Sequence, residues 1–262
     1  MTSGNGAAPK ARRLIAVAQA RSSGATTAAL ALGLCWPRPA LVAELDPAGG
    51  VLAARFGLSP NPGLLSLAAS DSAAGLALQA HTQPLGALPA ILGPVGPEAA
   101  SAALSRLLPE LPHVLSAFDV DVIADCGRLA AGGGPTVGVL TAASLVVLAV
   151  RPTADGVADL RHRLDLLAPD VRARTVVALI GSEPYPPAEV AAVLDVEVAG
   201  TLAWDPSAAD LLASGVTEGM RLGRSSLWRS ARTLAESLAH RLDQSIPASP
   251  AGLAARLVPW RS

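Results

Sequence analysis

Short, nearly uninterrupted runs of apolar residues recur along the 262-residue chain, with helical periodicity in the segments between them. The runs are Leu14–Ala18, Ala40–Leu45, Leu88–Leu92, Val120–Asp125, Leu145–Val150, Thr175–Ile180 and Val196–Leu202. Continuous apolar runs, unlike alternating ones, indicate strands that are buried on both faces. The intervening pattern predicts helices at Thr26–Leu34, Pro97–Leu108, Ala154–Leu167, Pro187–Leu194, Pro206–Ser214 and Ser226–Leu242.

This alternation predicts an α/β fold with a doubly wound, mostly parallel sheet flanked by helices in three layers. No change of composition divides the chain, so we expect one domain over 13–242, between a disordered arm at 1–12 and a flexible tail at 243–262. The stretch between Arg128 and Arg151 carries no charge and nominally reaches membrane-spanning length. Its Gly-Gly-Gly-Pro interruption argues against a span.

Composition narrows the function classes. A net charge of −1 with only 16% charged residues gives no bulk electrostatic indication of a nucleic-acid or membrane partner. Two cysteines, Cys35 and Cys126, exclude a disulfide framework and a multi-cysteine zinc site. The first residues lack the apolar core of a signal peptide, so we expect a cytoplasmic protein. Lys10 is the only lysine, so no lysine beyond it can take part in chemistry.

In open α/β sheets, ligands bind beyond the carboxyl ends of the strands. The first such turn here runs from Gln19 to Thr27. A phosphate-binding loop has the pattern G-x-x-x-x-G-K-[ST], and this turn keeps Gly24, Thr26 and Thr27 but has Ala25 at the lysine position. The alternative interpretation is an ordinary strand–helix turn whose threonine caps the helix. The Rossmann fingerprint G-x-G-x-x-G is absent.

Three later segments lie at or after the ends of other predicted strands. In chain order they are Glu44–Gly50 (ELDPAGG), Val122–Gly127 (VIADCG) and Thr201–Pro206 (TLAWDP). With the first turn, they resemble the ParA/MinD superfamily, P-loop ATPases that position DNA, division proteins and pili. The resemblance covers roughly Arg13 to Leu242. It is closest to orphan actinobacterial MinD-like proteins, here with a degenerate phosphate loop.

The resemblance implies roles for particular residues. Asp46 matches the acid that prepares the attacking water, and Thr26 and Asp125 match the side chains on the magnesium side. The implied nucleotide-binding residues are Arg21, Ser22, Ser23, Gly24, Ala25, Thr26, Thr27, Trp204 and Asp205. Structural alternatives stay open, because Asp-Pro followed by Gly-Gly is ordinary turn chemistry and an aspartate before proline often caps a helix.

The family normally has two loop lysines, one on the β- and γ-phosphates and one that reaches across a nucleotide-sandwiched dimer. Neither is present, and Arg21 is the best available substitute for the second. Loss of one charge-assisted phosphate contact costs roughly 1.5–3 kcal/mol. We therefore expect weak Mg-ATP binding with poor or absent hydrolysis, in a switch that positions or regulates a partner.

The alternative is a nucleotide-independent pseudo-ATPase scaffold that acts by protein–protein contacts. A dehydrogenase or hydrolase is disfavoured, since neither fingerprint glycines nor a nucleophile elbow is found. We expect a homodimer with an unidentified protein partner. DNA is possible but not indicated, with basic residues concentrated only between Arg221 and Arg232. Membrane contact is not expected, because the mildly amphipathic Leu253–Trp260 is short and contains Pro259.

Overall fold

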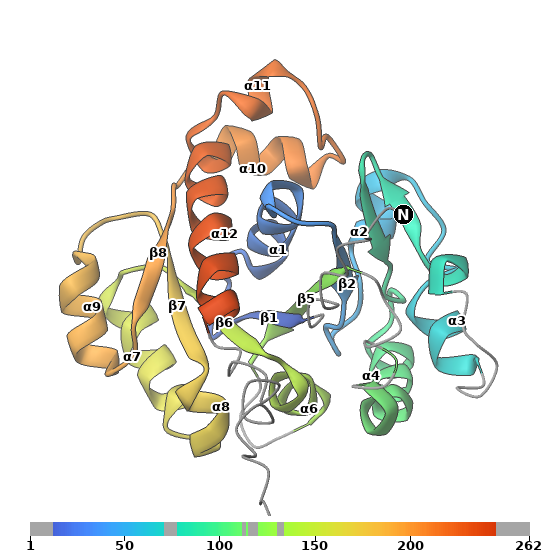
Figure 1. The fold of residues 1–262 in the computed structure, drawn as a ribbon, viewed down its shortest axis with the longest axis horizontal. Coiled ribbons are helices and arrows are strands. Elements are labelled where there is room, and N and C mark those ends of the chain that lie inside the picture. Colours follow the sequence, from blue (N-terminus) through green and yellow to red (C-terminus); the bar gives the residue numbers. More distant parts are fainter. Residues whose placement is uncertain (1–12, 71–77, 112–113, 115–119, 130–133, 245–262) are drawn as a thin grey trace, which may run out of the picture.

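The computed structural model describes residues 13–70, 78–111, 114, 120–129 and 134–244. Within them, eight strands form one sheet in the order β3-β4-β2-β5-β1-β6-β7-β8 (Figure 1). The strands are β1 (Leu14–Gln19), β2 (Ala40–Glu44), β3 (Gln83–Leu85), β4 (Leu88–Ile91), β5 (Asp121–Arg128), β6 (Leu145–Val150), β7 (Thr175–Ile180) and β8 (Val198–Leu202). All neighbouring pairs are parallel except the β3–β4 hairpin.

Helices cover both faces of this sheet. They are α1 (Ala25–Cys35), α2 (Leu52–Phe56), α3 (Leu64–Ala69), α4 (Pro97–Leu107), α6 (Pro135–Ala142), α7 (Ala154–Leu164), α8 (Pro169–Ala173), α9 (Pro187–Leu194), α10 (Pro206–Ala213), α11 (Met220–Gly223) and α12 (Ser226–Gln244). Two 3₁₀ turns, η1 (Leu78–His81) and η2 (Leu108–Glu110), complete the described elements. The α/β, doubly wound, three-layer architecture predicted from the sequence is confirmed.

Each face of the sheet has its own apolar core. One core joins the sheet to α1, α10, α11 and α12, and the other joins it to α3, α4, α6, α7 and α9. Helix α1 is apolar on all sides, as expected of a helix enclosed by protein. It lies beside α12 (Figure 1), and its Gly33 packs so closely on β2 that a Cβ there would be 2.7 Å from a methyl carbon of Val42.

Element boundaries match the sequence pattern closely, with informative exceptions. Strands β6 and β7 and helix α9 have the predicted ends. Strand β5 continues to Arg128, three residues past the predicted end, because it stays paired with β1 beyond a register shift. Strand β3 was not predicted: it is a three-residue edge strand containing a proline.

The C-terminal end of the predicted domain lies within α12. Helix α12 runs to Gln244, two residues past the expected boundary, and Arg38 binds the Asp243 carboxylate at 2.7 Å. The expected arm at 1–12 and the tail from 245, including Leu253–Trp260, lie outside the described residues. Among the described helices, none combines the length and apolar character needed to cross a membrane.

Candidate functional site

The turn between β1 and α1 adopts a compact shape at the carboxyl edge of the sheet. Gly24 has φ +90° and ψ +40°, a left-handed conformation that residues with a side chain rarely adopt. Its carbonyl accepts the first helical hydrogen bond, from Ala28 N at 2.8 Å. The predicted loop residues Ser22, Ser23, Gly24, Ala25, Thr26 and Thr27 therefore lie on one strand–turn–helix unit.

The side chain of Gln19, the last residue of β1, folds back into this turn. Its Oε1 accepts hydrogen bonds from the backbone N–H of Ser23 at 2.7 Å and of Ala25 at 3.1 Å. The sequence interpretation missed this role. The available signal was a lone polar residue at the end of an apolar strand, directly before the loop.

Asp125 lies within β5, next to this turn, and is 2% exposed. Burial raises its pKa to about 6, and the nearby charges of Glu44 and Asp46 also raise it. Hydrogen bonding from the Thr26 side chain and from Gly127 N, at 3.1 Å, partly opposes that rise. The structure thus brings together Thr26 and Asp125, the two residues expected on the magnesium side.

Asp46 comes two residues after the end of β2 and lies on the same acidic side. Its Oδ1 accepts a hydrogen bond from Ala48 N at 2.8 Å. A Cβ at Gly127 would lie 1.8 Å from Asp46 Oδ2, so the carboxylate packs directly on the Gly127 backbone. Burial raises the Asp46 pKa, while the Ala48 hydrogen bond and the positive charge of Arg128 lower it.

Glu44 is a second residue that the sequence interpretation passed over. It is 2% exposed, and Oε1 accepts hydrogen bonds from Val51 N at 2.7 Å and Leu52 N at 2.9 Å. Oε2 accepts one from Gly93 N at 2.9 Å. Burial raises the Glu44 pKa and these three bonds lower it. The side chain therefore links both ends of the turn that carries Asp46 to Gly93, the second residue after β4.

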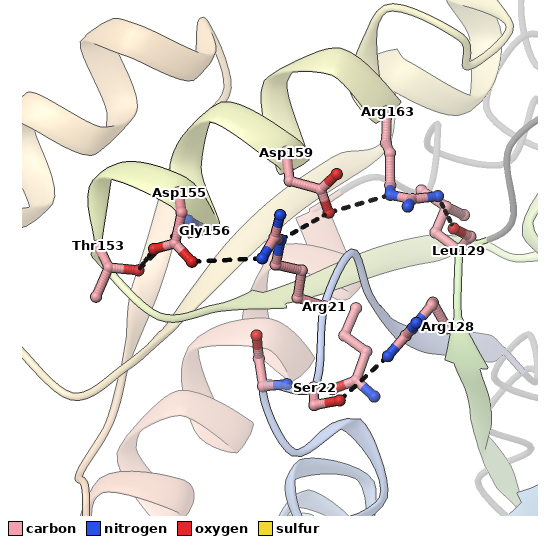
Figure 2. Close-up of polar contacts among 11 residues, drawn as sticks. Arg21, Ser22, Arg128, Leu129, Thr153, Asp155, Gly156, Asp159 and Arg163 are labelled. Carbon is pink, nitrogen blue, oxygen red and sulfur yellow. Dashed lines mark hydrogen bonds and ion pairs between the residues drawn. The ribbon is translucent and has the colours of Figure 1, made fainter.

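Arginines surround the other side of the loop (Figure 2). Arg21 forms ion pairs with Asp155 at 3.5 Å and Asp159 at 3.7 Å, both on α7. Arg163 also pairs with Asp159, at 3.3 Å. The expected phosphate-facing role of Arg21 stays a prediction, and in this structure its guanidinium is directed to α7.

Arg128, at the end of β5, donates from Nη2 to Ser22 Oγ at 3.1 Å (Figure 2). Its charge also acts on Asp46. It forms no ion pair with any residue that the structure describes, in contrast to Arg21 and Arg163. A cavity of about 570 Å³ lies among these arginines, Ser23 and the start of α7. Arg128 was not predicted, because the strand was expected to end before it.

A more apolar cavity of about 310 Å³ lies on the α10 side of the loop. It is lined by Ser23, Gly24, Thr27, Ala28, Ile180, Leu202, Trp204, Asp205, Pro206 and Leu227, among others. Trp204 is 57% exposed, and the Arg151 guanidinium carbon lies 4.3 Å from its ring centroid, a cation–π contact. The tryptophan also lines a neighbouring cavity of about 590 Å³.

Asp205 lines the apolar cavity, but its carboxylate has structural partners. Oδ1 accepts from Ala208 N at 3.0 Å, which caps α10. Oδ2 accepts from the backbone N and the hydroxyl of Ser226, at 3.1 and 2.8 Å. These hydrogen bonds lower its pKa. The cap that the sequence offered as the alternative for Asp205 is present, and a nucleotide-binding role stays a prediction.

The sequence matches no protein-family model and no curated protein. Solved structures do resemble it. A ParA family ATPase from Chlorobium tepidum superposes with a TM-score of 0.71 at 17% identity, over 87% of this chain and 99% of that one. Pyrococcus horikoshii MinD with Mg-ADP gives 0.66 at 19% identity, over 94% and 100%. MinD in the Aquifex aeolicus MinC:MinD complex gives 0.67 at 13% identity, over 91% and 98%.

The chain has the ParA/MinD fold. The turn after β1 is the segment that the sequence interpretation compared with the family's phosphate loop, and its sequence departs from that pattern. Ala25 stands at the loop lysine, and Ala20, Arg21 and Ser22 precede it in place of glycine-rich sequence. Thr26, Asp46 and Asp125 of the expected site are present around this turn, and no lysine is present in it.

Proposed function

We propose that this chain is a ParA/MinD-like, nucleotide-binding switch with weak or no ATP hydrolysis, which positions or regulates a cellular partner. The observation that carries the proposal is the meeting of Thr26 and Asp125 beside a left-handed Gly24. A buried carboxylate with a raised pKa destabilises the protein when it is ionised at neutral pH, and groups of this kind are concentrated at functional sites.

The donor set fits magnesium bound together with a nucleotide. A hydroxyl and a carboxylate are the oxygen ligands that Mg²⁺ accepts, and it usually keeps waters and phosphate oxygens as its other ligands. Among the described residues, no three His, Cys, Asp or Glu side chains form a cluster that could hold a metal ion by themselves. Thr26 and Asp125 would therefore hold the ion only with the phosphates, which supply its other oxygens and whose charge the ion neutralises.

The phosphate side lacks lysine, and Arg128 is the side chain best placed to supply a positive charge. It lies at hydrogen-bond distance from Ser22 of the loop and close enough to Asp46 to lower its pKa. Arginine is a planar, forked donor and not a compact charge, so it can stabilise a bound phosphate without reproducing the lysine geometry. This supports binding with slow turnover, since phosphoryl transfer depends on close positioning.

Trp204 and the apolar cavity beside it would bind the base of the nucleotide. A purine ring has the size and flat faces that suit a cavity bordered by a tryptophan and by Ile180. The Pyrococcus horikoshii neighbour was solved with Mg-ADP, which supports the same ligand class for this chain.

The proposal is tested by calorimetric titration with Mg-ATP. We expect measurable binding that Thr26→Ala and Asp125→Ala each weaken about tenfold or more, because each removes a metal-side oxygen. Thr233→Ala is the matched control, since Thr233 is an exposed threonine on α12. No binding at millimolar Mg-ATP would contradict the switch, and equal affinities in all variants would place the site elsewhere.

A nucleotide-independent scaffold is the second candidate, favoured by the internal partners that the loop already has. Gln19 satisfies two loop amides, and Asp155 and Asp159 engage Arg21. Under this alternative, Mg-ATP changes neither the stability nor the oligomeric state of the protein. Absence of turnover does not discriminate, because both candidates predict it.

By analogy with the MinC:MinD neighbour, we propose a homodimer that binds a protein partner in the cytoplasm. Size-exclusion chromatography with light scattering, with and without Mg-ATP, tests the dimer. A monomer under both conditions would contradict it.

A further inference from the structure

Gln19 occupies the part of the loop where a phosphate oxygen would bind. The backbone N–H groups of Ser23 and Ala25 point to one acceptor, its Oε1, at 2.7 and 3.1 Å. Gly24 lies between them in the left-handed conformation, which makes successive N–H groups converge on a concave anion site. An amide oxygen and a phosphate oxygen are the same kind of acceptor, so the two compete for these donors.

We propose that Gln19 is an internal plug of the phosphate loop, which a polyphosphate ligand must displace before it can bind. The proposal rests on the nucleotide site proposed above and adds the residue that sets its affinity. The plugged loop needs no ligand to satisfy the Ser23 and Ala25 amides. Its side chains are also engaged: Arg21 is held by Asp155 and Asp159, and Ser22 by Arg128.

The plug has a thermodynamic consequence. The apparent dissociation constant equals the intrinsic one divided by the fraction of molecules in which the loop is open. Two neutral hydrogen bonds hold the plug, so the open fraction is on the order of one tenth or less. Removal of the plug should therefore tighten binding of any ligand that places an oxygen between these amides.

Two substitutions at this position separate a plug from a merely structural side chain. Gln19→Ala removes the internal acceptor, and we expect it to bind pyrophosphate and Mg-ATP roughly tenfold more tightly than wild type. Gln19→Glu keeps the acceptor but adds a fixed negative charge on the same amides, so we expect it to bind at least tenfold more weakly. If the side chain served only to fold the loop, the order would reverse: Ala would bind worst and Glu would behave like wild type.

Amide hydrogen exchange of the ligand-free protein gives an independent readout. We expect Ser23 and Ala25 to be protected in wild type and in Gln19→Glu, and to exchange faster in Gln19→Ala. Gln79→Ala is the matched control, because Gln79 has an exposed side chain on η1. It should change neither exchange at these two amides nor binding.

The outcomes also separate this inference from the proposed function. If wild type binds Mg-ATP and Gln19→Ala binds no more tightly, the plug is refuted and the nucleotide site stands. If neither protein binds Mg-ATP or pyrophosphate at millimolar concentration, the nucleotide site fails and the plug fails with it.

Discussion

Asp125→Asn tests whether the protein retains a destabilising carboxylate for a ligand. Asn has nearly the same shape and keeps an oxygen that can accept the hydrogen bond from Gly127 N. The substitution removes the charge that burial opposes and replaces one acceptor oxygen by an amide NH2, to which the Thr26 hydroxyl can turn its own oxygen. We therefore expect the ligand-free variant to be more stable than wild type at neutral pH, which is the opposite of the usual effect of a change in a buried polar cluster.

The magnitude follows from the pKa. Burial raises the pKa of Asp125 from 3.8 to about 6 in the folded protein. One pKa unit corresponds to about 1.4 kcal/mol, so ionised Asp125 lowers the free energy of unfolding by up to about 3 kcal/mol at pH 7.5. The folded-state pKa is higher than the unfolded-state pKa. The wild-type protein therefore has its full free energy of unfolding below pH 4, where Asp125 is protonated in both states, and loses up to this amount as the pH rises through 6.

Urea unfolding at pH 4, 6 and 7.5, without nucleotide or metal, checks the prediction. The advantage of Asp125→Asn should be greatest at pH 7.5 and should nearly vanish at pH 4, where wild type is protonated too. Asp210→Asn is the matched control, because Asp210 is exposed on α10. An advantage that does not change with pH would come from packing, and no advantage at pH 7.5 would refute the electrostatic reasoning.

Two further substitutions probe the neighbours of this acid. Arg128→Gln should weaken Mg-ATP binding about tenfold in calorimetry, because it removes a charged donor beside the loop. Arg229→Gln, at an exposed arginine on α12, is the control and should leave the affinity unchanged. Equal affinities of the two variants would exclude Arg128 as the substitute for lysine. Gly127→Ala should lower the free energy of unfolding in urea by about 2–3 kcal/mol, because a Cβ would lie 1.8 Å from the Asp46 carboxylate in a left-handed residue. Gly57→Ala has a similar φ of +62° but open space around the Cβ, so it should lose only about 1 kcal/mol, and equal losses would mean that the Asp46 contact is not close.

The sequence was sufficient to predict where most strands lie along the chain and that the sheet is mostly parallel. Strands such as β6 and β7 are apolar on both faces, so their ends coincide with the change to polar or turn residues. The same signal fails at the sheet edge. Strand β3 is short, contains Pro84 and is fixed by pairing with β4 across the Gly86 turn, which no local pattern reports.

The site was predictable where it depends on position along the chain and not where it depends on side-chain direction. Thr26 and Asp125 were predicted from the resemblance of their segments to the ParA/MinD superfamily, and they meet because the carboxyl ends of β1 and β5 are neighbours in the sheet. Arg128 required the extra residues of β5, and Gln19 required the side chain to turn back on the loop. Both contacts depend on rotamers and register, which composition and periodicity do not specify.

The missing lysine and the Gln19 contact have one physical explanation. A phosphate loop without bound anion leaves several convergent N–H groups without acceptors, which is unfavourable in a partly buried turn. When a loop lysine is present, its charge favours an anion there. If this turn is a phosphate loop, as proposed, Ala25 adds no charge there, and a neutral internal acceptor such as Gln19 Oε1 competes more effectively for the amides. The general use of arginine for lysine does not account for Ala25, since arginine would have kept the charge.

Introducing the positive charge alone, by Ala25→Lys, should therefore strengthen pyrophosphate binding less than Ala25→Lys combined with Gln19→Ala. If the single variant binds as tightly as the double one, the absence of lysine alone explains the weak site and Gln19 does not contribute.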